Sequence, residues 1–282
     1  MANPEDVKAA IAEIFDRSAA TYEQVGPEFF APIGAELARR AAPRPGERVL
    51  DVGCGRGHSL LPAAEAVGTG GAAVGIDLAP GMVAGTAAEA ERRGLSQVSV
   101  LVGDATAPDV APGSFDVVIA GLVIFFLPDP DAALRAWAKA LGPGGRLALT
   151  TFGAQDPRHA QAMKTIVGFL PDAGTPTRRA AEALRDTEAV HRALLANGFT
   201  GIAHAEVTFE TRFDGPGQWW EWVWSHGGRD VVERLPADRV DAAREAACTV
   251  MEDARTPGGD LAIQTIVRYS TAVPVQESAV PG

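Results

Sequence analysis

Residues 49–57 read VLDVGCGRG, an apolar run that leads straight into a glycine-rich loop. Helical spacing resumes at Ser59, so the loop is predicted to join a strand to a helix. Glycines at such a junction allow the backbone to approach a ligand closely. Asp77 ends the next predicted strand, twenty residues after Gly57, where a carboxylate pairs with ribose hydroxyls in nucleotide-binding folds. The loop and the acid together predict a nucleoside site at the edge of a sheet.

Strand-like and helix-like segments alternate around this loop. Phe115–Ala120 is apolar on both faces, as expected of a strand buried inside a parallel sheet. The turn Gly142–Gly145 separates the last helix of the series from its last strand. A βαβα series of this kind predicts an α/β fold with a doubly wound parallel sheet. The predicted strands are Arg48–Gly53, Ala72–Ile76, Val98–Val102, Phe115–Ala120 and Arg146–Phe152, and the helices between them are Ser59–Val67, Pro80–Arg93 and Asp131–Leu141.

The remaining segments predict a mainly helical cap and the far edge of the sheet. Two helices, Pro4–Gln24 and Pro27–Ala42, precede the first strand. Further along, Thr187–Asn197 has helical spacing, whereas Ile202–Phe213 and Leu261–Tyr269 read as strands. We expect N-terminal cap helices over 1–45, a core over 46–152, a cap insertion over 153–185, a core helix and strand over 186–214, a tryptophan-rich cap insertion over 215–259, and a last core strand with a tail, loose from Ala272, over 260–282.

The composition limits the class of protein and its partners. The chain has 282 residues, 46% hydrophobic and 22% charged, which suits one large globular α/β domain with a cap. Its net charge of −11 disfavours nucleic acid and anionic membranes as partners. The two cysteines cannot make a disulfide framework, and no signal peptide is evident. The longest apolar run, Val117–Leu127, is about half of the ~20 residues that a membrane span needs. We expect a cytoplasmic protein, either a monomer or a homodimer.

The loop itself distinguishes among nucleoside ligands. Its glycines are spaced G-x-G-x-G, whereas a dinucleotide site uses G-x-G-x-x-G. Asp51 stands just before the loop, where it would repel a pyrophosphate but suit a ligand with an ammonium group. No lysine follows as in a P-loop, which disfavours ATP.

At this point the sequence resembles the class I S-adenosyl-L-methionine (SAM) dependent methyltransferases. The resemblance extends from Arg48 to Phe152 and rests on five motifs in order. These are VLDVGCGRG at Val49–Gly57, the acidic strand end Gly75–Asp77, Gly103–Ala105, SFDVV with AGL at Ser114–Leu122, and the turn LGPGGRL at Leu141–Leu147.

The resemblance implies a Rossmann-like core with SAM as cofactor, S-adenosyl-L-homocysteine (SAH) as product, and a role for each matching residue. Gly53 and Gly55 would leave room for the methionine part, whose ammonium Asp51 would bind through water or a neighbour. Asp77 would hold the ribose. The remaining implied cofactor contacts are Leu78 and Met82 on the adenine face, Asp104 and Ala105 at its edge, Gly121 and Leu122 near the methyl group, and Tyr22 over the methionine end.

The sequence shows no general base where the family often has one. Relatives often carry a histidine after the fourth strand, but Leu122–Leu127 is apolar here. His159 and His226 fall in the predicted cap, and imidazoles have a pKa suited to general base catalysis. Either one is a candidate base. A carboxylate, an acidic phenol or an enolate would react without any base.

Four tryptophans gather in the second cap insertion. Trp219, Trp222 and His226 share one face of the predicted helix. One interpretation is that several of these rings pack the cap onto the sheet, and the other is that one or two of them stack on a flat apolar acceptor. We expect Phe29, Phe125, Trp219 and Trp222 to contact a small apolar acceptor.

The leading hypothesis is a SAM-dependent methyltransferase of specialised metabolism, acting on oxygen or carbon, with nitrogen left open. The alternative is a relative that binds SAM and performs a cyclisation or isomerisation. A binding protein without turnover and a nicotinamide oxidoreductase are weaker alternatives. The sequence lacks the Asn/Asp-Pro-Pro-Tyr motif of enzymes that methylate amines in DNA, and it lacks the third cysteine that arsenic methylation needs. No His, Cys or Asp cluster has the spacing of metal ligands, so no metal is expected.

Overall fold

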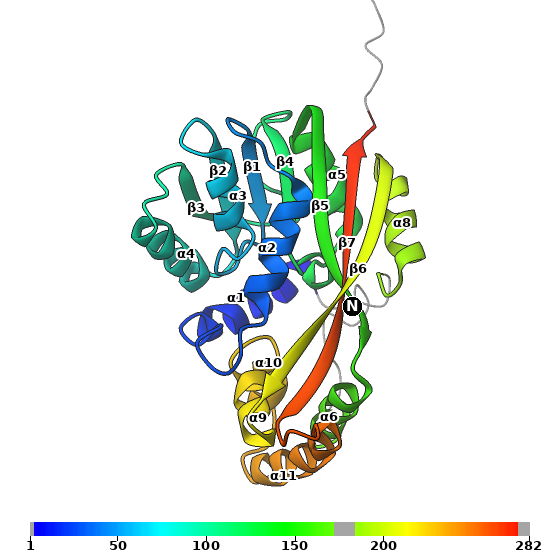
Figure 1. Cartoon of the computed structure of the whole chain (residues 1–282). Helices are drawn as coiled ribbons and strands as arrows, with labels where there is room; N and C mark the ends of the chain where they lie inside the picture. The colour runs from blue at the N-terminus through cyan, green and yellow to red at the C-terminus, as the bar shows by residue number, and fades with distance from the viewer. Residues whose placement is uncertain (1–2, 172–183, 276–282) are drawn as a thin grey trace, which may run out of the picture.

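The computed structural model describes residues 3–171 and 184–275, and residues 172–183 of the first predicted cap insertion lie outside the described residues. Within these described residues, seven strands form one sheet in the order β3-β2-β1-β4-β5-β7-β6 (Figure 1). Neighbours from β3 to β5 are parallel, whereas β7 is antiparallel to both β5 and β6. The predicted doubly wound, Rossmann-like α/β fold is confirmed. The strands are β1 (Arg48–Val52), β2 (Ala72–Asp77), β3 (Val98–Val102), β4 (Phe115–Ala120), β5 (Leu141–Gln155), β6 (Phe199–Phe213) and β7 (Leu261–Pro274).

Helices cover both faces of this sheet because successive side chains of its strands point to opposite sides. On β4, Val117 and Ile119 belong to one buried cluster, with side chains of α2 and α3. Val118 and Ala120 belong to another, with side chains of α5 and α8. The helices are α1 (Pro4–Ser18), α2 (Phe30–Ala41), α3 (Leu60–Val67), α4 (Pro80–Arg92), η1 (Ile124–Phe126), α5 (Pro130–Ala140), α6 (Pro157–Val167), α8 (Thr187–Ala196), α9 (Pro216–Trp224), α10 (Arg229–Glu233), α11 (Val240–Met251) and η2 (Glu252–Ala254).

Strands β6 and β7 extend far beyond the rest of the sheet. Their pairing continues to Phe213 and Leu261, whereas the pairing of β7 with β5 ends at Thr265. Figure 1 shows α6, α9, α10 and α11 gathered around this two-stranded extension, away from β1–β4. The cap therefore lies past the carboxyl end of β5.

Two strands continue several residues beyond their predicted ends. The last strand continues to Pro274, so the tail is not loose from Ala272, because Ala272 pairs with Leu147 and Val273 with Thr200. Strand β5 continues past Phe152 to Gln155, where it pairs with Thr265. Both differences come from antiparallel partners that lie distant in the sequence.

The N-terminal segment also differs from its prediction. The first helix ends at Ser18 and not at Gln24, and Glu23 adopts a positive φ of 58°. The Glu23 carboxylate accepts hydrogen bonds from the backbone N–H groups of Phe29, Phe30 and Ala31 at 2.6–3.2 Å. A carboxylate at a helix N-terminus satisfies donors that have no partner inside the helix. Glu23 thereby fixes the start of α2.

Within the described ranges, no helix has both the length and the apolar character that a membrane crossing requires.

Candidate functional site

A cavity of about 340 Å³ opens where the glycine loop leaves β1 and continues to the cap. Gly53, Gly55 and Asp77 lie at what we call its glycine-loop end. Phe29, Phe125 and Trp222 lie at what we call its aromatic end. Ligands of open α/β sheets bind at the carboxyl ends of the strands, and the glycine-loop end occupies this place.

The glycine loop is fastened to the second strand. Gly53 and Gly55 have φ of 69° and 50°, which glycine adopts without the penalty that a Cβ brings. The carboxylate of Asp77 accepts from the N–H of Gly55 at 2.8 Å and from the N–H of Ala79 at 2.9 Å. Burial raises the pKa of Asp77, although these backbone donors act in the opposite direction. Asp77 thus lines the cavity directly beside the loop.

Asp51 lies beneath the loop, fully buried, and does not itself line the cavity. Ser59, a residue that does line the cavity, donates from its Oγ to Asp51 Oδ2 at 2.6 Å. The other oxygen, Oδ1, is buried without a hydrogen-bond partner among the described residues. Burial raises the pKa of Asp51 to about 7, with the Ser59 hydrogen bond opposing it. A cation bound near Ser59 would offset this unfavourable burial of a carboxylate.

Asp104, like Asp51, is separated from the cavity, while the next residue, Ala105, lines it. Lys8 of α1 contacts Asp104 Oδ2 at 2.8 Å, and the N–H of Thr106 donates to Oδ1 at 2.7 Å. Lys8 and Phe15 line the same cavity. Helix α1 therefore forms part of the cover of the glycine-loop end.

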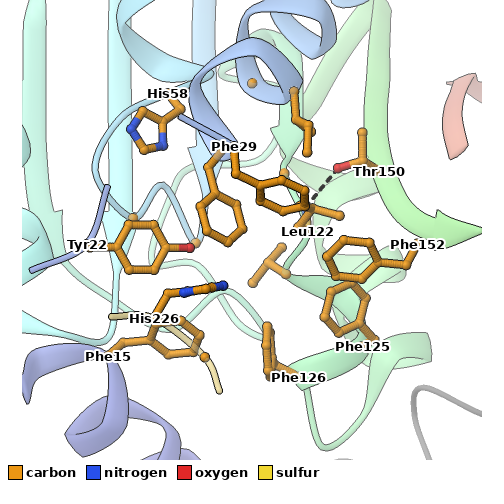
Figure 2. A pocket seen from close by; sticks show the side chains of 18 of the residues that line it. Phe15, Tyr22, Phe29, His58, Leu122, Phe125, Phe126, Thr150, Phe152 and His226 are labelled. Atoms are coloured by element: carbon orange, nitrogen blue, oxygen red, sulfur yellow. Dashed lines mark hydrogen bonds between the residues drawn. The ribbon is translucent and has the colours of Figure 1, made fainter. Parts of the chain in front are cut away.

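The floor of the cavity is a strained turn after β4. Leu122 has a φ of 50°, which is unusual for a residue other than glycine. Its N–H donates to Thr150 Oγ1 on β5 at 2.9 Å, a bond that Figure 2 shows beside the aromatic side chains. This bond holds Leu122 against the cavity. The predicted apolar floor is present, with Phe125 and Phe126 on η1.

Aromatic rings surround the other end of the cavity (Figure 2). Tyr22 stacks on Phe30 with ring centroids 4.8 Å apart, and Phe29 meets Trp222 edge-on at 5.2 Å. On the sheet side, Phe125 lies 5.5 Å from Phe152. Such a wall suits a flat apolar molecule.

Two histidines add polar atoms to the aromatic end. His159 of α6 and His226, just after α9, both line the cavity. Burial lowers the pKa of both imidazoles, to about 4 for His226. Both are therefore neutral at neutral pH, when each carries one N–H and one lone pair.

The structure gathers fourteen of the predicted residues around one cavity and leaves three outside it. Asp51 and Asp104 lie just outside, as described. Trp219 lies outside because it is fully buried behind His159, to which its indole N–H donates at 3.1 Å, so its predicted direct contact with the acceptor was wrong. The fourteen are Tyr22, Phe29, Gly53, Gly55, Asp77, Leu78, Met82, Ala105, Gly121, Leu122, Phe125, His159, Trp222 and His226.

Several residues that line the cavity were not predicted from the sequence. Phe15 lies on the apolar face of the first helix, so its periodicity was a usable signal. Thr150 and Thr265 lie on β5 and β7, where nothing in the local sequence marks them. In the part of the chain that the structure describes, no group of three or more His, Cys, Asp or Glu side chains is arranged to hold a metal ion.

Comparison with known proteins identifies sequence relatives. A family model described as a methyltransferase domain matches residues 43–185. The nocamycin O-methyltransferase of Saccharothrix syringae is 39% identical over 272 residues, which cover 92% of this chain and 96% of that protein. The aklanonic acid methyltransferase DauC of a Streptomyces species, strain C5, is 46% identical over 144 residues, covering 51% of this chain and 66% of that protein.

A solved structure shares the fold. A phosphoethanolamine N-methyltransferase 2 of Haemonchus contortus, in complex with S-adenosylhomocysteine, matches with a TM-score of 0.61 at 19% identity. The match covers 98% of this chain and 61% of that one. At this identity the likeness concerns the fold alone.

Proposed function

Since the chain belongs to the class I SAM-dependent methyltransferases, we propose that it transfers a methyl group to an oxygen atom of a small, largely apolar natural product. The single observation that carries this proposal is one cavity that joins the glycine loop to a wall of aromatic rings. The first end suits the cofactor, and the second suits an apolar acceptor.

The residues at the glycine-loop end fit SAM. The buried, unpartnered Oδ1 of Asp51 calls for a positively charged ligand nearby, and SAM carries an ammonium and a sulfonium. When bound, SAM supplies an electrophilic methyl group on its sulfonium centre. We assign Asp77 to the ribose and Asp51 to the ammonium through Ser59 or water. The assigned cofactor contacts also include Tyr22, Gly53, Gly55, Leu78, Met82, Ala105, Gly121 and Leu122, whereas Asp104 would act from outside the cavity through its neighbour Ala105.

The aromatic end would orient the acceptor and exclude water from it. Phe29, Phe125 and Trp222 line the cavity, and the rings of Phe29 and Trp222 pack edge-on against each other. Holding an acceptor oxygen in line with the methyl group supplies most of what the protein contributes to such a transfer. These rings therefore act by positioning and not by proton transfer.

Oxygen is favoured over carbon or nitrogen by two considerations. One relative is named as an O-methyltransferase and another for an acid. In addition, a histidine whose pKa has fallen to about 4 is a weak base, so His226 suits an acceptor that ionises by itself. We infer an acceptor with a carboxylate or a comparably acidic hydroxyl.

The test begins with binding. We would titrate the protein with SAM and with SAH by calorimetry, together with Asp77→Ala and Asp51→Ala. We expect micromolar binding that both substitutions weaken strongly. Failure of the wild-type protein to bind either ligand would overturn the proposal.

The second step is turnover. Apolar aromatic carboxylic acids, phenols and enols would be incubated with methyl-labelled SAM, each beside its pre-methylated form as a matched control. We expect the labelled methyl group to be transferred to the free acid or hydroxyl compound but not to its pre-methylated form. A substrate that is rearranged while SAM is not consumed would favour the cyclase alternative instead, which the methyltransferase relatives do not favour.

A further inference from the structure

His159 and His226 both pack against Trp222 at the aromatic end of the cavity. Their ring centroids lie 6.0 Å and 4.4 Å from that of Trp222. Each imidazole has one ring nitrogen engaged by the protein. The hydrogen on that nitrogen determines what the other nitrogen presents to a ligand.

His159 is held as a hydrogen-bond donor. The indole Nε1–H of Trp219 points at His159 Nδ1 over 3.1 Å. An indole nitrogen can only donate, so Nδ1 must carry the lone pair and Nε2 the hydrogen. Protonating Nδ1 would set two N–H groups against each other. No hydrogen-bond partner for Nε2 occurs among the described residues, and the ring lines the cavity, so its N–H is free for a ligand.

His226 is held in the opposite state. The Ser225 hydroxyl donates its single hydrogen to the carbonyl oxygen of Trp222 at 2.8 Å. Ser225 Oγ has no second hydrogen, so it can only accept a hydrogen bond from His226 Nδ1, which lies 3.3 Å away. The hydrogen of His226 sits on Nδ1, and Nε2 keeps its lone pair. Figure 2 shows the imidazole of His226 pointing in among the aromatic rings.

The surroundings keep both rings neutral. Burial lowers the pKa of His159, and the nearby Asp156 opposes this only in part. Burial also lowers the pKa of His226, and neutral aromatic rings, those of Tyr22, Phe30 and Trp222, face it. Asp156 is itself occupied by Arg158 and by the N–H of Gln264.

We propose that His159 and His226 form a donor and acceptor pair that selects the acceptor molecule, with Trp219 as the residue that positions His159. The pair fits a flat apolar molecule that has a carbonyl or carboxylate oxygen for His159 Nε2–H and a hydroxyl hydrogen for His226 Nε2, as in a hydroxylated aromatic acid. This inference rests on the proposed function for the nature of the ligand. It replaces the expectation that His159 is a general base, because His159 turns no lone pair toward the cavity.

The decisive measurement is the tautomer of each ring, which needs no substrate. Protein labelled with ¹⁵N-histidine would be studied by long-range ¹H–¹⁵N correlation at neutral pH, with His159→Gln and His226→Gln used for assignment. We expect a neutral Nε2–H ring for His159 and a neutral Nδ1–H ring for His226. An imidazolium, or the reverse tautomers, would overturn the proposal whether or not the protein methylates anything.

Trp219→Phe tests the positioning role directly. It removes the N–H but keeps an aromatic ring, so the signals of His159 should shift toward a mixture of tautomers. Trp224→Phe on the same helix is the matched control, because that ring contacts Arg229 and does not line the cavity. An unchanged tautomer of His159 in Trp219→Phe would contradict the role of Trp219.

Kinetics with an acceptor found by the turnover screen complete the test. Trp219→Phe should raise the KM for the acceptor by up to about fivefold, the limit reached if the hydrogen bond from His159 were lost completely. The kcat and the affinity for SAH should stay near those of the wild-type protein, and so should both parameters in Trp224→Phe. A fall in kcat with an unchanged KM would overturn the selection role.

Discussion

The ammonium of Lys8 lies 2.8 Å from a carboxylate oxygen of Asp104, and this ion pair connects the first helix to the loop after β3. The two side chains are 18% and 24% exposed, so water screens the pair only in part. Hydrogen bonding to Asp104 raises the pKa of Lys8. Burial raises the pKa of Asp104, but Lys8 and the N–H of Thr106 outweigh it and hold that pKa below its usual value. Helix α1 is thereby held over the glycine-loop end of the cavity.

We predict that Lys8→Met speeds the release of SAH. A partly exposed ion pair contributes about 1 kcal/mol, which corresponds to roughly a fivefold faster dissociation if opening of α1 limits release. Stopped-flow displacement would measure the rate, with Lys139→Met as the control because Lys139 does not line the cavity. Equal rates for Lys8→Met and the wild-type protein would mean that α1 does not gate the ligand.

Binding of SAM should release a proton near pH 7. The pKa of Asp51 is raised to about 7 by burial, so this carboxyl is partly protonated in the free protein. A bound ammonium favours the carboxylate and lowers that pKa, so affinity should rise with pH up to about 8 and level off above it.

Calorimetry in buffers with different ionisation enthalpies would count the released protons. Asp51→Asn keeps the size of the side chain but cannot ionise, so it should remove both the proton release and the pH dependence. A wild-type protein that binds SAM without exchanging protons would show that Asp51 does not respond to the ligand.

Gly53 and Gly55 should tolerate alanine differently. A Cβ on Gly53 would lie 2.4 Å from Val123 Cγ2 at a φ of 69°, so Gly53→Ala should destabilise the fold by about 3 kcal/mol. At Gly55 no heavy atom of the described residues other than Gly55 and its two chain neighbours lies within 4 Å of the added Cβ, and only the φ of 50° costs energy, about 1 kcal/mol.

That open space is where we place the cofactor. Gly55→Ala should therefore stay folded but bind SAM at least tenfold more weakly, as measured by urea denaturation and calorimetry on the same sample. Normal affinity in a stably folded Gly55→Ala protein would remove Gly55 from the cofactor site.

The elements around the glycine loop were predictable because their signals are local. The loop Val49–Gly57, the acid at Asp77 and the buried pattern of Phe115–Ala120 each follow from residues next to one another. The parallel core then follows from the handedness and length of βαβ units. Most of the residues at the glycine-loop end could be named because these local motifs resemble those of the class I SAM-dependent methyltransferases.

The aromatic end was harder to predict because its contacts join distant segments. Helical spacing placed Trp219 and Trp222 on one face, yet Trp222 lines the cavity while Trp219 lies behind His159, sixty residues earlier in the chain. Likewise, Glu23 lies in a turn before α2 and has a positive φ, and its carboxylate accepts a hydrogen bond from the N–H of Phe30 at the start of that helix. Periodicity reports which face of a helix is apolar, but not which buried ring touches a ligand.

The burial of His226 should make the stability of the protein depend on pH. Its pKa falls from 6.5 to about 4 on folding, mainly because burial penalises the charged form. Below pH 6.5 the unfolded chain therefore binds a proton that the folded protein does not bind until about pH 4. The free energy of unfolding falls through this window, by about 2 kcal/mol between pH 6.5 and pH 5 for this one group.

Comparison with His226→Phe isolates this contribution. The raised pKa of Asp51 acts with the opposite sign, since its folded form binds the extra proton as the pH falls below 7, so the wild-type curve alone is ambiguous. Asp51 is present in both proteins, and its effect cancels in their difference. Urea denaturation at several pH values should show that the wild-type protein loses more stability than His226→Phe as the pH falls from about 7 to 5. A difference that stays constant over this range would mean that folding leaves the pKa of His226 unchanged, and the burial that we assign to its imidazole would then be contradicted.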